Sequence, residues 1–296
     1  MIKFNVSNIN PDYNFDIYGV SYIGKPISNT IMYVSLKIAD KICKLDDVEN
    51  CLVFAETGIQ VSDRILEKNA IIIVDNPQLE YAKAVTKIFK LQQKEDAQHK
   101  YIFHEGGYYI SEKAVIGENA YIEPGCRIGH NVKIGNNAIL LTGTIINHAD
   151  IGNNFISNEY AVIGANGFTM TKDENSNMVR IPTLGKVIIG NNVEVGVHNN
   201  ISRGSAGNTV IEDNVKLDAF VHIGHDVIIK KNAQIVAGVV TGGFDVIGNN
   251  AYIGLNATLK NRIEIGDNAK IGMSAAVIQS LDGDGTFAGN PARKYR

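Results

Sequence analysis

Aliphatic residues recur at every sixth position over most of the second half of the chain. One series covers residues 110–146, a short one covers 189–201, and a third covers 211–277, which only Thr241 interrupts. A small or β-branched residue follows four positions after most of these aliphatics, and a glycine often follows directly. A period of six fits neither an α-helix nor a plain hairpin sheet, whereas short strands joined by tight turns satisfy it.

We interpret each hexad as one short strand followed by a tight turn, so that three hexads make a triangular coil of about 18 residues. The aliphatic and the small residue point inward, the glycine permits the turn, and the remaining positions face water. This pattern predicts an all-β parallel β-helix, which we assign to residues 106–296.

Residues 1–105 lack this period and predict a small α/β domain. Asp75-Asn76-Pro77 predicts the start of a helix, because proline is preset for the first turn, and the apolar stripe of this helix reaches Phe89. The polar residues 92–100 are expected to form a hinge. Three short apolar runs predict buried strands, at 31–35, 51–55 and 70–74.

The six-residue period is interrupted twice. Residues 164–186 are mostly polar and predict a long loop, and a loop of that length on a rigid scaffold is usually functional. Residues 203–208 make a smaller shift of phase and contain two glycines.

Composition narrows the possible classes of protein. Lys plus Arg number 28 against 31 Asp plus Glu, a net charge of −3, which argues against a nucleic-acid-binding protein. The first ten residues lack the charged head and apolar run of a secretory signal, and aliphatic runs such as 70–74 are too short to form an integral membrane segment. Three cysteines without metal-ligand spacing indicate a reduced, cytoplasmic compartment and predict no metal site.

Four segments carry a resemblance to a known family: DNPQLEYAKAVTKIF, VIGANGF with RIPTLGKVIIGNNVEVG, NNISRGSAGNTVIEDNVKLD, and VHIGHDVII. Through them the chain resembles the UDP-3-O-acylglucosamine N-acyltransferases of lipid A synthesis over nearly its whole length. The resemblance implies a left-handed β-helix and a homotrimer with active sites in the grooves between neighbouring β-helices. It also implies that the N-terminal domain holds the nucleotide of a nucleotide sugar.

The last third of the chain also resembles bacterial sugar N-acetyltransferases of the sialic-acid and bacillosamine type. The pair His225-Asp226 and the tail GTFAGNPARKYR carry this second resemblance. The helices with which the lipid A family engages acyl carrier protein are missing after the β-helix. We therefore expect a short acyl-CoA donor.

His225 is the candidate general base. It stands in the segment that matches the family's catalytic histidine, and two positions after Ile223 its side chain points away from the coil axis. Asp226 and Asp218 are both candidates to orient it, and the sequence does not choose between them. Gly243, one coil later, corresponds to the family's oxyanion donor, although a glycine there also simply allows a bend.

Further residues are expected to bind the substrates. Tyr33 is aromatic at the first of the family's two nucleobase-stacking positions, while the chain has Leu36 and Ala39 at the related positions; the alternative is a half-buried strand residue. The other candidates are Phe168, His198, Arg203 and His222 for the sugar nucleotide, and Gly238, Lys260, Arg262 and Arg293 for coenzyme A.

The sequence thus predicts an N-acyltransferase that acylates the amine of a nucleotide-linked amino sugar in cell-envelope or surface-glycan biosynthesis. Its co-substrate is expected to be acetyl-CoA or another short acyl-CoA, with no permanently bound cofactor. One open alternative is the lipid A enzyme itself, with acyl carrier protein as donor. The other is a non-catalytic β-helix scaffold, or a carbonic-anhydrase-like solenoid with an inter-subunit zinc on His198, His222 and His225.

Overall fold

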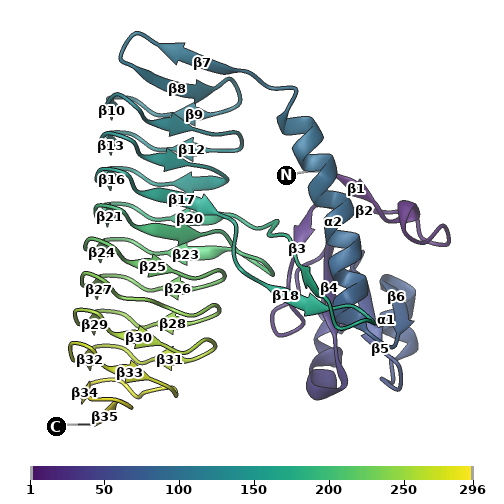
Figure 1. Ribbon diagram of the computed structural model, residues 1–296. Helices are drawn as coiled ribbons and strands as arrows, with labels where there is room; N and C mark the ends of the chain where they lie inside the picture. Colours follow the sequence, from purple (N-terminus) through teal and green to yellow (C-terminus); the bar gives the residue numbers. More distant parts are fainter. Residues whose placement is uncertain (1–2, 295–296) are drawn as a thin grey trace. The chain divides into compact units, whose positions relative to one another are not determined.

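The computed structural model describes residues 3–294, and these residues divide into two compact units (Figure 1). The first unit extends to Ala97 and also includes Phe168–Gly185 and Ser205–Gly207, and the second unit holds the rest. The first two residues of the N-terminal stretch and the last two of the tail GTFAGNPARKYR lie outside the described residues.

The first unit is built on a four-stranded parallel sheet in the order β3-β4-β5-β6. All three predicted strands are confirmed, because apolar side chains of β4 and β5 are buried on both faces of the sheet. Two 3₁₀ helices and a two-stranded antiparallel ribbon complete its N-terminal part. The elements are β1 (Phe4–Asn5), η1 (Val6–Asn8), β2 (Asp16–Ile17), β3 (Gly19–Val20), β4 (Thr30–Val34), η2 (Leu36–Asp47), β5 (Leu52–Glu56), α1 (Asp63–Lys68) and β6 (Ala70–Val74).

Helix α2 (Pro77–Asp96) packs on this sheet through its apolar side. It begins at the predicted residue, where the side chain of Asn76 accepts a hydrogen bond from the backbone N–H of Leu79 at 3.1 Å. The helix continues to Asp96 with Gln92 buried, so the predicted hinge at 92–100 is wrong over its first half. No helix within residues 3–294 combines the length and the apolar run that crossing a membrane requires.

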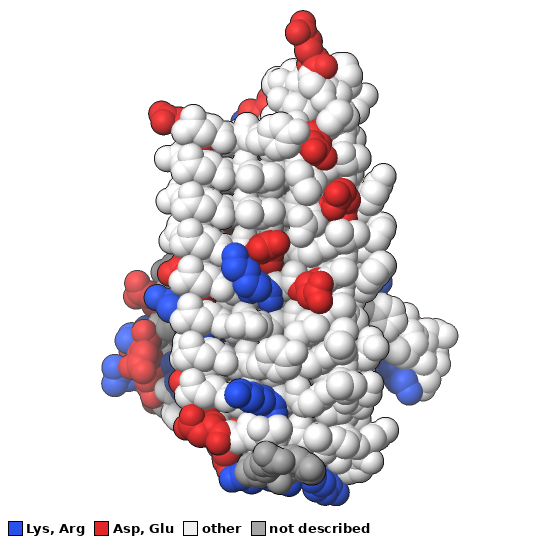
Figure 2. All heavy atoms as spheres, turned by 90° about the vertical axis from the view of Figure 1, so that its left-hand side faces the viewer, with Lys and Arg blue, Asp and Glu red and all other residues white. Residues whose placement is uncertain are grey.

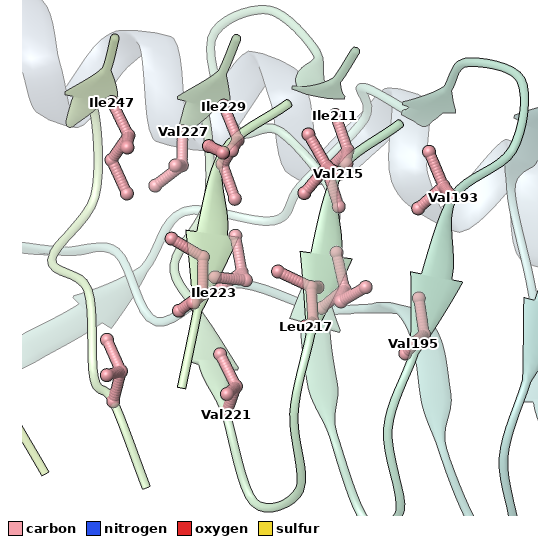
Figure 3. Packing of buried hydrophobic residues seen from close by; sticks show 14 of the residues in the cluster. Val193, Val195, Ile211, Val215, Leu217, Val221, Ile223, Val227, Ile229 and Ile247 are labelled. Carbon is pink, nitrogen blue, oxygen red and sulfur yellow. The ribbon is translucent and has the colours of Figure 1, made fainter. Parts of the chain in front are cut away.

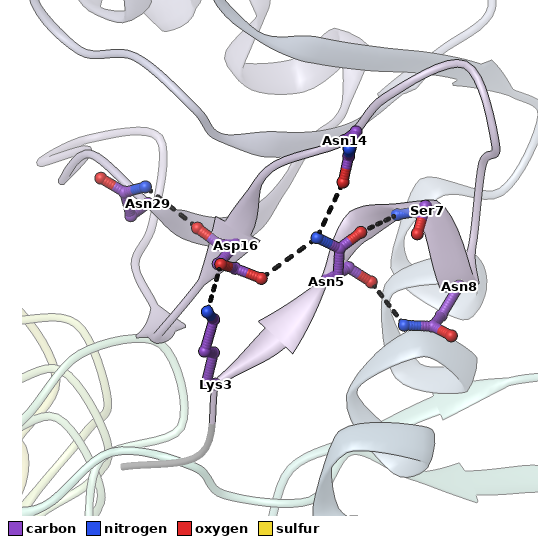
Figure 4. A network of polar contacts seen from close by, with 7 residues as sticks. All are labelled: Lys3, Asn5, Ser7, Asn8, Asn14, Asp16 and Asn29. Carbon is purple, nitrogen blue, oxygen red and sulfur yellow. Dashed lines mark hydrogen bonds and ion pairs between the residues drawn. The ribbon is translucent and has the colours of Figure 1, made fainter.

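A small polar network ties down the start of the first unit (Figure 4). The carboxylate of Asp16 accepts from Asn5 Nδ2 at 3.1 Å and pairs with Lys3 Nζ at 2.9 Å, and Asn29 Nδ2 donates to the Asp16 carbonyl at 3.0 Å. The Lys3 pair is exposed and contributes little to stability. The network fixes the register of β1 and β2.

The predicted loop 164–186 is largely a β-hairpin of the first unit. Strands β18 (Met170–Lys172) and β19 (Met178–Arg180) pair antiparallel, and Asp173 closes the turn by accepting the N–H groups of Asn175 and Asn177. Ile181, just after β19, is buried in the core of this unit with side chains of α2. The prediction of a long polar loop was therefore wrong for these residues, because Thr171 on one arm and Ile181 after the other are buried.

The second unit is a parallel β-helix, in which strands one coil apart stack in register (Figure 1). Its chain visits a seven-stranded, an eight-stranded and a ten-stranded sheet in turn. The seven-stranded sheet holds β7 (Tyr101–His104), β8 (Tyr108–Ser111), β11 (Arg127–Ile128), β14 (Ile145–Ile146), β17 (Val162–Ala165), β22 (Asn200–Ser202) and β25 (His222–Ile223), and the pair β30 (Thr258–Leu259) and β33 (Ala276–Val277) continues its column beyond single bridges at Val240.

The other two sheets complete the triangle. The eight-stranded sheet holds β9 (Val115–Ile116), β12 (Lys133–Ile134), β15 (Ala149–Ile151), β20 (Val187–Ile189), β23 (Thr209–Ile211), β26 (Ile228–Ile229), β28 (Val246–Ile247) and β31 (Glu264–Ile265). The ten-stranded sheet holds β10 (Tyr121–Ile122), β13 (Ile139–Leu140), β16 (Ile156–Ser157), β21 (Glu194–Val195), β24 (Lys216–Leu217), β27 (Gln234–Ile235), β29 (Tyr252–Ile253), β32 (Lys270–Ile271), β34 (Thr286–Ala288) and β35 (Arg293–Lys294).

The hexad aliphatics form one continuous core inside the coils. Figure 3 shows successive rows of them, with Ile211, Ile229 and Ile247 aligned from coil to coil. The small residue four positions later, such as Val215 or Val227, fills the space beside each turn. The inward assignment of both positions is confirmed, because nearly all of these side chains are fully buried.

Three corners join the three sheets, and each corner has its own residues at the left-handed turn position. The asparagine corner leads from the eight-stranded to the ten-stranded sheet. Its side chains form a ladder in which Nδ2 of one asparagine donates to Oδ1 of the next at 2.9–3.2 Å. The residues with positive φ there are Asn119, Asn137, Asn154, Asn192, Asn214, Asn232, Asn250, Asn268 and Asp284.

The aromatic corner leads from the ten-stranded to the seven-stranded sheet. Tyr160, His198 and Phe220 take three successive left-handed positions of this corner, with φ of 56–58°. Their rings stack in sequence with centroids 5.3 and 5.4 Å apart. The Tyr160 ring also lies over Gly143, where a Cβ would come within 2.5 Å of it.

The histidine corner leads from the seven-stranded to the eight-stranded sheet and carries both interruptions of the period. One residue is also missing between Ile146 and Ile151, which brings His148 into the left-handed position with φ 45°. Farther along the same corner the left-handed positions are taken by Asp226, Phe244 and Arg262. This corner is therefore the one that departs from the regular hexad.

Candidate active site

His225 lies on the histidine corner, in the turn between β25 and β26. Its Nδ1 is 2.8 Å from Oδ2 of Asp226, whose backbone N–H donates to Oγ1 of the buried Thr209 at 2.9 Å. The left-handed φ of 61° at Asp226 places its carboxylate beside the preceding imidazole. Because a carboxylate only accepts, the tautomer of a neutral imidazole that fits this contact has its proton on Nδ1 and its lone pair on Nε2. The pair has the geometry of a general base with its orienting carboxylate.

Asp218, the other carboxylate considered for this role, lies on the aromatic corner. Its Oδ1 accepts from the backbone N–H of Ala219 at 2.7 Å, and its Oδ2 accepts from that of Ala237 at 3.2 Å. Within one chain these bonds hold two turns of neighbouring coils together. Of the two open candidates, the one in contact with His225 is Asp226.

Two glycines enclose the imidazole of His225. A Cβ on Gly243 would lie 2.7 Å from both Cε1 and Nε2 of the ring, and a Cβ on Gly167 would lie 2.8 Å from the Cβ of His225. Only glycine leaves these volumes to the histidine, because real Cβ contacts are longer. The sequence suggested a bend or an oxyanion donor as the reason for glycine at position 243. The space that the imidazole of His225 needs is a third reason. The side chain of His225 is 15% exposed, so the ring is held in place and still reaches solvent.

Phe244 and Arg262 extend the site along the same corner. The Phe244 ring meets His225 edge-on, with centroids 5.3 Å apart. The Arg262 guanidinium lies over the Phe244 ring, 4.2 Å from its centroid. The candidate coenzyme A residue Arg262 is therefore joined to His225 through one aromatic ring, and it is exposed.

Burial changes the protonation of two neighbouring groups. Burial, followed by the proximity of His225, lowers the pKa of His222 on β25. Burial raises the pKa of Asp245 to about 7, although the backbone N–H groups of Ile263, Gly242 and Arg262 oppose this rise. A neutral His222 adds no positive charge beside the candidate base.

The remaining predicted residues are spread over several places. His198 and Gly238 lie on the aromatic corner, whereas His222 lies in strand β25 and His225 on the histidine corner. Within residues 3–294 no cluster of three or more metal-ligating side chains is found. Lys260 is exposed and directly follows β30, and Arg293 lies in the terminal strand β35.

Three further candidates are placed by their burial. Arg203 is 1% exposed, and its backbone N–H donates to the carbonyl of Ala165 at 2.8 Å, so it lies in the interior of the histidine corner. Tyr33 of the first unit is half-buried, with its ring 5.2 Å from that of Tyr81. Phe168, also in the first unit, is 77% exposed and lies 5.7 Å from the Arg180 guanidinium.

Sequence reasoning missed Gly167, Phe244 and Asp245 as parts of the site. Gly167 was visible only as the last glycine of the motif VIGANGF. Phe244 takes a turn position where most other turns have Asn, and Asp245 takes an inward position where the adjacent coils have Val227 and Ile263. Both residues depart from the hexad pattern and follow directly after Gly243. These departures were the signal in the sequence that could have located them.

Comparisons with known proteins support the repeat and the family resemblance. Residues 113–148 and 208–243 match the family described as bacterial transferase hexapeptide (six repeats). A UDP-3-O-acylglucosamine N-acyltransferase of Coxiella burnetii is 32% identical over 183 residues, which are 53% of this chain and 50% of the relative. A UDP-3-O-acylglucosamine N-acyltransferase 2 of Legionella pneumophila is 51% identical over 84 residues, 28% of this chain and 24% of the relative. The chain thus spans about half the length, or less, of these curated relatives.

Solved structures support the fold. A UDP-N-acetylglucosamine acyltransferase of Francisella novicida matches with a TM-score of 0.58 and 27% identity, over 65% of this chain and 68% of that chain. The UDP-N-acetylglucosamine O-acyltransferase of Moraxella catarrhalis matches with a TM-score of 0.59 and 24% identity, over 65% and 73%.

The stacked hexads and these matches define the class: the chain is a hexapeptide-repeat protein, in which a left-handed parallel β-helix follows a small α/β domain in the sequence. The predicted fold class is confirmed. The resemblance to the UDP-3-O-acylglucosamine N-acyltransferases is also confirmed, over about half of the chain.

Proposed function

We propose that the protein is an N-acyltransferase that acylates the amine of a nucleotide-linked amino sugar, with His225 as general base. The single observation that carries this proposal is the bond of 2.8 Å between His225 and Asp226 on a glycine-lined corner. The names of the relatives supply the reaction type, since they are N-acyltransferases of an acylated glucosamine nucleotide. The pathway is cell-envelope or surface-glycan biosynthesis in the cytoplasm.

In the proposed reaction the amine nitrogen attacks the carbonyl carbon of a thioester. Nε2 of His225 takes the proton that the nitrogen loses as the C–N bond forms. The negative charge on the carbonyl oxygen needs a hydrogen-bond donor, and the backbone N–H of Gly243 is the candidate. When the C–S bond breaks, the sulfur leaves and receives the proton from His225, which restores the neutral imidazole.

The donor is proposed to be acetyl-CoA or another short acyl-CoA. Arg262 supports this choice, because an exposed guanidinium close to His225 suits the phosphates of coenzyme A. Lys260 and Arg293 are further candidates for those phosphates, and Gly238 for the approach of the pantetheine arm. Acyl carrier protein is the rival donor, which the resemblance to the lipid A family implies.

A homotrimer is proposed as the working state. Figure 2 shows a face of the molecule with few charged residues, on the side where the strands β10 to β34 are labelled in Figure 1. The outward residues of that sheet include Tyr121, Ile139, Ile156 and Tyr252. A charge-poor face of this kind suits contact with another copy of the chain. A neighbouring copy is also expected to bring His198 and Asp218 toward the substrates.

The first unit is proposed to hold the nucleotide through Tyr33. A nucleobase that stacks on this ring binds from one side, and each such stack contributes about 1–3 kcal/mol. We expect Tyr33→Ala to raise KM for the sugar nucleotide about tenfold while kcat changes little, because remote stacking is uniform binding. Contact of Tyr33 with Tyr81 makes Tyr33→Phe the control, and an unchanged KM in Tyr33→Ala contradicts this role.

The experiment that tests the function is a matrix of thiol-release assays and thermal shifts. UDP- and dTDP-linked amino sugars are crossed with acetyl-CoA and with an acyl-acyl-carrier-protein. Thiol release that needs both acetyl-CoA and one sugar, and that His225→Ala removes, supports the proposal. Turnover with the carrier protein alone favours the lipid A reaction. Neither binding nor turnover with any pair favours the scaffold alternative and overturns the proposal.

A further inference from the structure

One coil of the β-helix has polar side chains at inward positions that are apolar in the adjacent coils. These are Thr241 and Asp245, both fully buried, on either side of the histidine corner. The matching inward residues are Ile223 and Val227 in the coil before, and Leu259 and Ile263 in the coil after. In this coil the strand of the seven-stranded column also shrinks to the single bridging residue Val240. The local backbone therefore departs from the regular repeat together with the sequence.

Thr241 holds the residue that precedes His225. Its Oγ1 accepts the backbone N–H of Gly224 at 2.9 Å. In regular coils the corresponding N–H donates to a backbone carbonyl of the next coil, as Gly129 does to Ile146 at 2.7 Å. The hydroxyl thus replaces the ladder acceptor at the turn where His225 stands.

Asp245 holds the opposite side of the same segment. Its Oδ1 accepts the backbone N–H of Ile263 at 3.1 Å, and the N–H groups of Gly242 and Arg262 also act on the carboxyl. Its Oδ2 is buried and has no hydrogen-bond partner among the described residues. An incompletely paired buried polar atom costs about 1–3 kcal/mol relative to an apolar side chain of similar shape. A side chain kept at such a cost is expected to serve geometry instead of stability.

The residues between Thr241 and Asp245 are those against which the candidate base rests. The imidazole of His225 lies over Gly243 and meets the edge of Phe244. We propose that Thr241 and Asp245 are positioning residues, which fix the segment Gly242–Phe244 beneath His225 and so set the orientation of its imidazole. The inference rests on the proposed function for its kinetic consequence, and on the contacts alone for its structural one.

The kinetic test replaces each side chain by valine, which is apolar and close in shape to threonine. Thr241→Val and Asp245→Val are expected to keep or raise the melting temperature and to lower kcat by about tenfold or more, with KM within about twofold, because small misplacement of a base is costly. Asp245→Asn retains an acceptor and is expected to stay within about threefold of the wild-type kcat. Ile247→Val in the same coil is the matched control for core damage, with kcat unchanged.

The structural test needs no activity. Histidines labelled with ¹³C at Cε1 give one NMR signal each, and loss of a signal in His225→Gln assigns His225. The ring current of Phe244 makes this signal sensitive to the orientation of the imidazole. We expect the His225 signal to move in both valine variants and to stay in Asp245→Asn and Ile247→Val.

The two tests separate the two proposals. A wild-type protein without acyl transfer, whose His225 signal still moves in the valine variants, contradicts the proposed function and keeps the positioning role. A His225 signal and a kcat that are both unchanged in Asp245→Val and Thr241→Val overturn the positioning role. A loss of kcat that Ile247→Val reproduces also overturns it.

Discussion

The histidine corner and the asparagine corner are made from the same hexapeptide but behave differently. At the asparagine corner every left-handed position holds Asn or Asp, and the side chains bond to one another from coil to coil. At the histidine corner the corresponding positions of successive coils hold Asp226, Phe244 and Arg262, which contact His225 or one another. The turn residues of the first corner join coils, and those of the second surround the candidate base or contact one another.

The two corners differ in the residues at their left-handed turn positions. A non-glycine residue with positive φ is strained, and asparagine tolerates this conformation best. The histidine corner accepts the strain of Phe and Arg at such positions, together with the buried carboxyl of Asp245. Because the regular coils on both sides determine the backbone, they can hold this strained segment in place.

The largest expected effect comes from His225→Ala. Loss of the general base is expected to lower kcat by about 10²–10⁴-fold, while the free energy of unfolding falls by about 1–3 kcal/mol because the buried Asp226 loses the imidazole that it contacts. Steady-state kinetics and urea unfolding check both numbers. Lys231→Ala, at the same hexad position on the asparagine corner, is the control and is expected to leave kcat unchanged. Activity within twofold of wild type in His225→Ala removes the assignment.

Gly243→Ala against Gly248→Ala compares the two corners directly. A Cβ at either position meets atoms within 2.7 Å, from the His225 ring at Gly243 and from Asp267 at Gly248. Both variants are expected to lose about 1–3 kcal/mol of stability by overpacking. Only Gly243→Ala is expected to lower kcat, by about 10–100-fold, because its imidazole must move. Equal kcat values in the two variants contradict the role of Gly243 beneath His225.

The pH dependence of stability isolates Asp245. Its pKa is raised from 3.8 to about 7 in the folded protein, so the folded state binds a proton that the unfolded state loses near pH 4. This group therefore lowers stability as pH rises from about 4 to about 7, and adds no further change above that. Between pH 5 and pH 8 we expect Asp245→Asn to gain about 2–3 kcal/mol relative to wild type in urea unfolding. A gain that is equal at both pH values contradicts the raised pKa.

The smallest expected effect is at the asparagine corner. Asn250→Gly keeps the left-handed turn without strain but removes the ladder bonds from Asn232 and to Asn268. We expect a loss of about 1 kcal/mol in the free energy of unfolding and no change in kcat. A drop in kcat here shows that the two corners are coupled, which the comparison excludes.

The repeat could be predicted from the sequence because every hexad buries the same two positions, and burial is a local property of a short strand. The effect of the residue missing between Ile146 and Ile151 could not be predicted, because both aliphatic side chains still point inward and only the turn between them is shorter. The hairpin at 168–185 was missed because its buried residues are few, and only tertiary contact with α2 decides their burial.

The sequence predicts the centre of the candidate site but not the side chains around it. His225 followed from the matched segment VHIGHDVII, but the choice of Asp226 over Asp218 depends on the left-handed turn at Asp226, which the sequence does not specify. The space above Gly243 is likewise a property of the neighbouring coil. Contacts between coils are set by stacking register, and one sequence without its fold leaves that register open.

The asparagine ladder has a consequence for how such a protein changes over evolution. Asn154 and Asn192 are 38 residues apart, because a whole hairpin is inserted at another corner, yet their side chains bond at 2.9 Å like those of neighbouring coils. The contact between two coils at this corner is therefore independent of segments inserted at another corner. Segments of different lengths can be inserted at one corner of the triangle while the other two corners keep their register.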